Sequence, residues 1–174
     1  MSRRYGVGIS AAQSANTVAN SLRAILGLPI DNVVGGAAQL DFVHICESQE
    51  AGLGLQCRLQ IARVTLANIP AGGTNTTDGG AGAGKPWALD PSNSLASRVG
   101  SNSSYLCKHS YNDAAVTVAS IVGEFGFYSN AGIILSGKDL EDAYWNYNSA
   151  LMFLISHGSG SAAPKWGGQV CWKE

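Results

Sequence analysis

The stretch AQLDFVHICESQEAGLGLQCRLQIARVTL, residues 38–66, decides the fold, because apolar and polar residues alternate in two successive runs. In the first run Leu40, Phe42 and Cys46 share one parity, and in residues 53–61 every second residue is apolar. A period of two residues is typical of strands with one buried face. With SQEAG as the turn between the runs, the stretch predicts an antiparallel hairpin with one face toward a core.

The alternation changes phase after Ile61. Arg63 falls where an inward residue is due, and Val64 and Leu66 take up the apolar parity instead. One extra residue in a strand moves the side chains that follow to the opposite face. The sequence therefore predicts a β-bulge near Ala62.

Length and composition limit the class of protein. The 174 residues are enough for one domain with its own core and too few for two ordinary ones. Only 13% of the residues are charged, against about a quarter in average proteins, and the net charge is −1. Nucleic-acid binders neutralise phosphates with clustered Lys and Arg, whereas the one pair of adjacent basic residues here is Arg3 and Arg4. This balance argues against nucleic-acid binding.

Neither a membrane segment nor a metal site is expected. No stretch reaches the length of about 18 apolar residues that a span needs, and the first residues lack the order of a signal peptide. A soluble protein that is not secreted by that route is the expectation. Cys46, Cys57, Cys107 and Cys171 form no CxxC motif or Cys/His cluster, which argues against zinc. Reduced, buried thiols in a cytoplasm are expected, and a disulfide framework is the alternative.

Residues 1–34 are predicted to form an N-terminal arm, and residues 35–174 the main domain. The opening MSRRYGVGIS is short, basic and contains glycine, as in a tail that is mobile or lies on a neighbouring molecule. In segment 14–27, SANTVANSLRAILG, apolar residues recur on one helical face behind a serine cap at Ser10 or Ser14, which predicts a short helix. Because Asn, Thr and Val are poor helix formers, a strand is the alternative.

Residues 70–104 are predicted to be a long loop, since Gly, Thr, Asn and Ser dominate them and apolar periodicity is almost absent. Trp87 interrupts this loop, and it either pins the loop to its own domain or contacts another subunit. The GGAGAGK run lacks the spacing of a phosphate-binding loop. Pro86 follows it and stops the helix that such a site would need, so no nucleotide cofactor is expected.

The last third of the chain alternates short apolar runs with turn residues. It predicts strands at residues 105–110, 115–122, 124–128, 133–135, 150–155 and 166–174. The run ALMFLI is apolar at six consecutive positions, so it needs cover on both faces and predicts a central strand. Trp166, Val170 and Trp172 share one parity of the last strand. The predicted fold is mainly β, an antiparallel β-sandwich or jelly roll, with a short N-terminal helix or arm.

The segment GKDLEDAYWNYNS, residues 137–149, places carboxylates beside aromatic rings. That combination suits a glycosidase or a sugar-binding site, where acids transfer protons and rings stack on sugars. The alternative, which we favour, is a solvated loop whose aromatic rings turn inward or into a subunit contact. The three histidines are far apart and no nucleophile motif accompanies them. No catalytic residue, cofactor or metal ligand is predicted, and an enzyme is not expected.

The order of several segments resembles that of small β-rich virion proteins of tailed bacteriophages. These segments are residues 42–65, a GGT-containing loop, EFGFYSNAGIIL (124–135), ALMFLIS (150–156) and WGGQVCWKE (166–174). The resemblance covers residues 35–174. It implies a capsid decoration or cement protein, made in the host cytoplasm, that sits as a jelly-roll-like trimer on the outer surface of a shell of major capsid protein.

A homo-oligomer agrees with the sparse charge and the Gly, Ala and Ser-rich loops. The predicted interface consists of residues without an evident role inside one sandwich: Arg3, Arg4, Tyr5, Val7, Trp87, Leu89, Tyr144, Trp145 and Tyr147. One alternative is a coat or minor capsid subunit that itself forms the shell. The other is a carbohydrate-binding β-sandwich, such as an adhesin or receptor-binding module, with Trp87, Tyr144 and Trp145 as stacking platforms.

Overall fold

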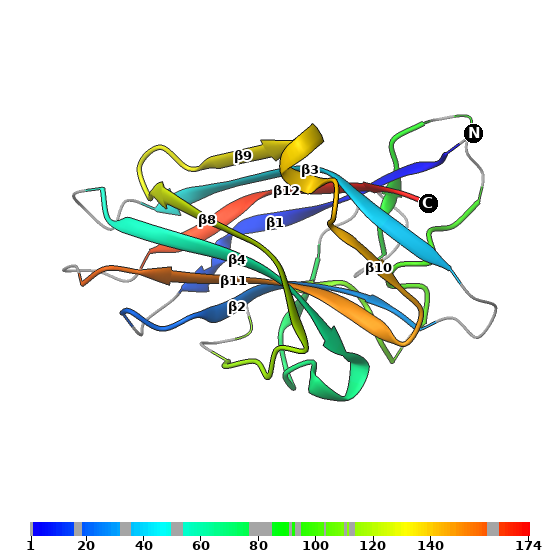
Figure 1. Cartoon of the computed structure of the whole chain (residues 1–174), viewed down its shortest axis with the longest axis horizontal. Coiled ribbons are helices and arrows are strands. Elements are labelled where there is room, and N and C mark those ends of the chain that lie inside the picture. Colours follow the sequence, from blue (N-terminus) through cyan, green and yellow to red (C-terminus); the bar gives the residue numbers. More distant parts are fainter. Residues whose placement is uncertain are drawn as a thin grey trace.

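A computed structural model gives the fold as two antiparallel sheets packed face to face (Figure 1). It describes residues 2–15, 19–31, 36–49, 54–76, 85–90, 92, 95–102, 104–109, 111, 114–159 and 164–174, and the side chains of all of these except 10–15 and 49. Sheet A has the order β10-β3-β12-β1-β6, with β9 also paired to β3. Sheet B has the order β5-β7-β2-β11-β4-β8.

The strands and the two short 3-10 helices have the following bounds. Sheet A contains β1 (Arg4–Ala15), β3 (Ala37–Gln49), β6 (Trp87–Ala88), β9 (Ile133–Ser136), β10 (Tyr144–Asn146) and β12 (Lys165–Lys173). Sheet B contains β2 (Arg23–Ile30), β4 (Gln56–Thr65), β5 (Thr74–Asn75), β7 (Lys108–His109), β8 (Ser120–Tyr128) and β11 (Ser149–His157). The 3-10 helices are η1 (Leu66–Asn68) and η2 (Gly137–Leu140).

The longer strands pair in a nested order. β1 pairs with β12, β2 with β11, β3 with β9 and β4 with β8. The chain thus runs as one long two-stranded ribbon that wraps over itself, so that successive pairs fall alternately in sheets A and B. This is the jelly-roll arrangement of two Greek keys, and the predicted fold class is confirmed.

The predicted hairpin across residues 38–66 is wrong in its pairing. β3 lies in sheet A beside β12, whereas β4 lies in sheet B between β11 and β8. Both strands are present and both bury one face in the same core. Alternation reports that each strand has a buried face, but it does not identify the neighbouring strand, because two strands facing each other across a core show the same pattern as two paired strands.

The irregularity predicted near Ala62 is present, but it does not change the phase of β4. The register of β4 against β8 shifts between Ile61 and Ala62, and the extra residue is Val122 of β8. β4 itself keeps its alternation along β11. Ala62, Val64 and Leu66 point away from the core between the sheets. They belong to a second buried apolar cluster on the outer face of sheet B. Gln60, expected on a wet face, is also buried on that side, where it donates to Glu124 at 3.0 Å.

The change of phase occurs in β3 instead. The ladder between β3 and β12 passes from Phe42 to Leu40 and leaves Asp41 as the extra residue. Leu40 before this bulge and Val43 after it both face the core, so Phe42, predicted to face inward, lies on the outer face. The same shift turns Cys46 outward, which corrects the predicted parity of this strand.

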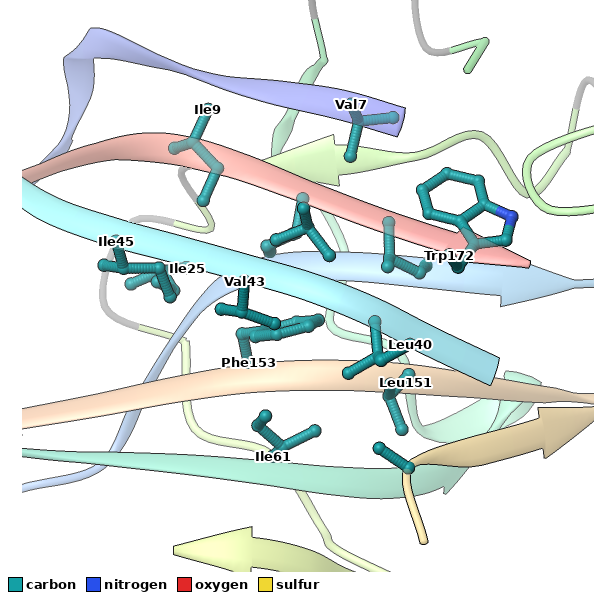
Figure 2. Close-up of a cluster of buried hydrophobic side chains, with 14 of the residues drawn as sticks. Val7, Ile9, Ile25, Leu40, Val43, Ile45, Ile61, Leu151, Phe153 and Trp172 are labelled. Carbon is teal, nitrogen blue, oxygen red and sulfur yellow. The ribbon is translucent and has the colours of Figure 1, made fainter. Parts of the chain in front are cut away.

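The core between the sheets is a single apolar cluster. Figure 2 shows Val7, Val43 and Trp172 from sheet A facing Ile61 and Phe153 from sheet B. β11 lies between β2 and β4, as predicted for a central strand. Its odd-numbered residues 151–155 enter this core, and its even-numbered residues 150–154 enter the outer cluster. The six-residue apolar run is therefore covered on both faces.

The N-terminal arm and helix are wrong for the residues that the structure describes. β1 lies between β12 and β6, and Tyr5, Val7 and Ile9 are buried. The predicted helical segment instead ends β1 and begins β2, and residues 16–18 lie outside the described residues. All residues from 24 to 30 are buried, so the run that resembled a helical face is a strand covered on both sides.

The long loop and its flanks hold little regular structure. In the described parts of residues 70–104 the strands are the two-residue β5 and β6, and the glycine run at 79–84 lies outside the described residues. Trp87 packs on the core and pairs with Gly6 of β1, so it pins the loop to its own domain. The strand predicted at 115–122 begins only at Ser120, because residues 116 and 118 pack on the outer cluster without joining a ladder.

Candidate interaction surface

Most of the large exposed apolar side chains belong to strands at one edge of the sandwich or to the turn beside it. Among the described residues seven such side chains are exposed, and five of them belong to β8, β9, β10 or the turn after β10: Ile121, Tyr128, Ile134, Tyr144 and Tyr147. β8 is the last strand of sheet B, and β9 and β10 lie at the corresponding end of sheet A (Figure 1). We call this the β8–β10 edge. Ile121 and Tyr128 lie near opposite ends of β8, and Ile134 belongs to the other sheet, so the five side chains mark these strands and do not form one continuous patch.

Arg63 connects the two sheets at this edge through its contacts with Tyr144 and Asp142. Its Nε donates to the carbonyl of Tyr144 at 2.6 Å, and one terminal nitrogen donates to the carbonyl of Asp142 at 2.8 Å. The guanidinium carbon lies 4.5 Å from the centre of the Tyr144 ring, a cation–π contact. Arg63 thus joins β4 of sheet B to β10 of sheet A and fixes a tyrosine that is 54% exposed. The sequence signal for this role was a charged residue, Arg63, at a position of β4 where an inward apolar residue was expected.

The carboxylates of the acidic segment face solvent around these rings. Asp139 caps η2, since the backbone N–H of Ser136 donates to its Oδ2 at 3.4 Å. Glu141 and Asp142 are exposed, and the contacts that they supply to Gln39 and Arg63 come from their backbone carbonyls. Asp139 therefore has a structural function, and the other two carboxylates are available at the surface.

The predicted interface residues divide into buried and exposed groups. Tyr5, Val7 and Trp145 are at most 1% exposed, so they belong to the core and not to a surface. Trp145 packs edge-on against Trp172 with ring centres 6.3 Å apart. Arg3, Arg4, Leu89, Tyr144 and Tyr147 are exposed, and Trp87 is half-buried. Tyr144 and Tyr147 lie near β10, at one end of the strand order of sheet A. The other exposed members lie near β1 and β6, at the other end.

Arg4 takes part in a charge cluster on the outer face of sheet A. Its guanidinium and the ammonium of Lys173 both pair with Asp41, the bulged residue of β3. Partial burial of Asp41 opposes ionisation, but the hydrogen bonds and positive charges of Lys173 and Arg4 outweigh it and lower the pKa of the carboxyl. The cluster ties β1, β3 and β12 together.

A polar groove of about 350 Å³ lies on the outer face of sheet B. Arg58, Glu124, Gln56 and Ser156 are among the residues that line it. Arg58 lies 3.5 Å from Glu124, which also accepts from Gln60. The groove has room for a small polar ligand, but its charged groups are already paired with one another.

The cysteines are poor nucleophiles where burial affects them. The four cysteines are free thiols, and burial raises the pKa of Cys57 to about 12 and that of Cys171 to about 11. A thiol with such a pKa stays protonated and unreactive at neutral pH. Within the described part of the chain no group of His, Cys, Asp and Glu is arranged to hold a metal ion. No helix in that part is long and apolar enough to cross a membrane.

Comparisons with protein-family models, with curated proteins and with solved structures find no match to this chain.

Proposed function

We propose that this chain is a viral structural protein, a capsid decoration or cement protein that binds the outside of a phage shell. The observation that carries the proposal is the β8–β10 edge of a jelly roll, where four large apolar side chains are exposed on the strands and Tyr147 is exposed in the turn after β10. Jelly rolls serve as viral capsid domains, although they also serve as lectins and cupins. The order of segments that resembles phage virion proteins selects the first of these uses.

The composition and the geometry both suit a protein that binds a partner and catalyses no reaction. Exposed aromatic rings that are already held in place lose little freedom on binding and dominate interface energetics. Tyr144 is such a ring, because Arg63 fixes its backbone and its face. A protein of this kind stabilises a shell by binding only its closed form, so opening the shell requires the loss of that interface.

The test is reconstitution onto empty shells assembled from the major capsid protein encoded in the same genome. We expect the purified chain to sediment with the shells and to raise the temperature at which they open. The double variant Tyr144→Ala/Tyr147→Ala should keep its fold but reduce occupancy at least tenfold, as expected for two aromatic contacts. Thr117→Ala, an exposed position on the outer side of sheet B, is the matched control. Shells that remain bare at saturating protein would exclude this function.

A carbohydrate-binding function is the second candidate, and the polar groove on sheet B favours it. Tyr128 is 59% exposed and pairs in the ladder with Gln56, which lines the groove, so a ring and polar groups stand side by side. The stacking platform predicted at Trp145 is not available, because that ring is buried. Binding on a glycan array that Arg58→Ala abolishes would support this candidate over shell binding.

A further inference from the structure

Strand β8 presents a long unpaired edge. Among the described residues it is the last strand of sheet B, so no strand pairs with its outward side (Figure 1). The other strands at the ends of the two sheets, β5, β6, β9 and β10, have two to four residues, whereas β8 has nine. Proteins discourage pairing at a sheet edge with very short strands, lysine or proline. β8 is long and contains neither residue, so its edge is open to another strand.

The ladder with β4 determines which backbone groups of β8 point outward. The N–H of Ser129 donates to the carbonyl of Leu55 at 2.9 Å, and the register of Gln56 with Tyr128 places these two residues opposite each other. Hydrogen-bonded pairs alternate along an antiparallel ladder with pairs whose N–H and C=O groups point away. Residues 123, 125 and 127 therefore bond to β4. The N–H and C=O groups of residues 124, 126 and 128 point outward.

The side chains of β8 alternate between the two faces of sheet B. The outer face carries residues 121, 124, 126 and 128, which keep their phase because Val122 is the extra residue of the bulge. Ile121 is 58% exposed and Tyr128 is 59% exposed. Glu124 is the only charged residue of the strand, and it is paired with Arg58. The open edge is therefore apolar at both ends and nearly neutral.

We propose that this chain forms a two-fold dimer in which β8 pairs antiparallel with β8 of a second copy, centred on Phe125. Ile121 of each copy then lies opposite Tyr128 of the other, a favourable pair of a β-branched and an aromatic side chain. Glu124 lies opposite Gly126 and exchanges two backbone hydrogen bonds with it, because the N–H and C=O groups of both residues point outward. The B sheets of the two copies become one continuous sheet.

Other registers and other occupants fit this edge less well. A pairing centred on Glu124 would place two carboxylates opposite each other, which is unfavourable. A pairing centred on Gly126 would place Ile121 opposite Asn130, beyond the end of the partner strand, and leave it uncovered. An unrelated extended segment could use the same backbone groups, but β8 itself carries the apolar side chains at the two positions that match. This self-complementarity favours a second copy as the occupant.

The self-contact goes beyond the proposed function, since it needs no shell and uses neither Tyr144 nor Tyr147. Its first test removes an outward N–H group. Gly126→Pro loses an N–H that points away from β4, whereas the matched control, Gly126→Ala, keeps it. A Cβ atom at residue 126 meets no atom within 4 Å, so the site has room for both.

Sedimentation velocity over a range of concentrations measures the Kd of the dimer, and circular dichroism checks each fold. The symmetry removes two hydrogen bonds in Gly126→Pro, and two proline rings block the approach. We expect the Kd to rise about tenfold or more in Gly126→Pro and to stay nearly unchanged in Gly126→Ala. If Gly126→Pro does not fold, Ile121→Lys/Tyr128→Lys replaces it, because both positions are exposed and lysine discourages edge pairing.

Cysteine variants test the register. Residues 124 and 126 of different copies form a hydrogen-bonded pair with Cα atoms about 5.5 Å apart, a distance that a disulfide bridges. We expect oxidation to cross-link a mixture of Glu124→Cys and Gly126→Cys, and neither variant alone, on a non-reducing gel. The unaltered protein, with its four free thiols, gives the background.

The outcomes decide the proposal separately from shell binding. A wild type that stays monomeric at millimolar concentration would overturn the dimer, and so would a Gly126→Pro protein that associates as well as Gly126→Ala. A mixture without cross-links, or cross-linking of one cysteine variant alone, would overturn the pairing centred on Phe125. No shells are present in these measurements, so a failure here leaves the proposed function to the reconstitution experiment.

Discussion

Sheet B has an apolar inner face and, around β11, an apolar region on its outer face, and different kinds of structure cover the two. The inner face meets sheet A, a second set of strands with a regular pattern. The outer face is covered by η1 and by connecting segments, among them residues near Leu22, Ile69, Tyr111 and Val116. A face covered by a sheet can adjust little when a side chain is removed, whereas a face covered by loops can collapse onto the gap. We therefore expect that equal burial on the two faces does not imply equal rigidity.

The largest expected effect comes from a charge on the inner face. Leu59 is fully buried in the core between the sheets, so Leu59→Asp should cost about 5 kcal/mol or more and prevent folding. Gln56→Asp, an exposed position of the same strand, is the control and should fold normally. Far-ultraviolet circular dichroism reports both. A folded Leu59→Asp protein would show that the inner face is not the rigid one.

Neighbouring residues of β11 compare the two faces directly. Phe153 and Met152 are both fully buried, Phe153 on the inner face and Met152 on the outer. We expect Phe153→Ala to lower the free energy of unfolding by about 4 kcal/mol and Met152→Ala by about 2 kcal/mol. Urea denaturation measures both values. An equal loss would contradict the idea that the outer cover relaxes more easily.

A variant of Arg63 measures how much a contact at the edge contributes to stability, compared with the two buried faces. Arg63→Met keeps most of the side-chain length but loses the hydrogen bonds to Tyr144 and Asp142, and it should cost about 1–3 kcal/mol. Hydrogen exchange of the amides in residues 142–146 should become faster. The control, Arg58→Met, loses an exposed ion pair with Glu124 and should change stability by less than about 1 kcal/mol. Unchanged exchange in Arg63→Met would mean that β10 holds its place without this arginine.

The smallest effect concerns the charge cluster of Arg4, Asp41 and Lys173 on the outer face of sheet A. The pKa of Asp41 is lowered in the fold, so its stabilisation is present above the unfolded pKa of about 4 and is lost as the pH falls through the lower folded pKa. Because Arg4 and Lys173 are 55% and 40% exposed, we expect about 1 kcal/mol or less. Thermal melting of wild type and Asp41→Asn should differ at pH 7 and converge in acid. A constant difference across the range would contradict the linkage.

The parts of the fold that the sequence predicts are those with a pattern of burial. The apolar run at 150–155 required cover on both faces, and β11 has it. Trp166, Val170 and Trp172 share the core, as their parity predicts. The pairing of β3 with β12 rather than with β4 could not be predicted, because it depends on contacts between distant segments.

The candidate surface was harder to predict than the fold. Tyr144 and Trp145 are adjacent aromatic residues, and only their place in a three-residue strand sends one outward and the other into the core. Tyr5 and Val7 alternate with glycines, a pattern that resembles a flexible tail until β12 and β6 are known to flank it. The exposed leucines at 89 and 95 lie in a segment without periodicity, so the sequence carried no signal of their exposure.

The pairing of β1 with β12 has a consequence for the order of folding during synthesis. Arg4 lies opposite Lys173, so β1 can complete its main pairing only after β12 has been synthesised. Until then β1 exposes Tyr5, Val7 and Ile9, which are buried in the finished fold. Contacts between residues so distant in sequence form slowly and leave strand edges open to other chains in the meantime. The pairing of β1 with β12 is therefore expected to be a late step in the folding of sheet A, and the chain is most open to aggregation before it forms.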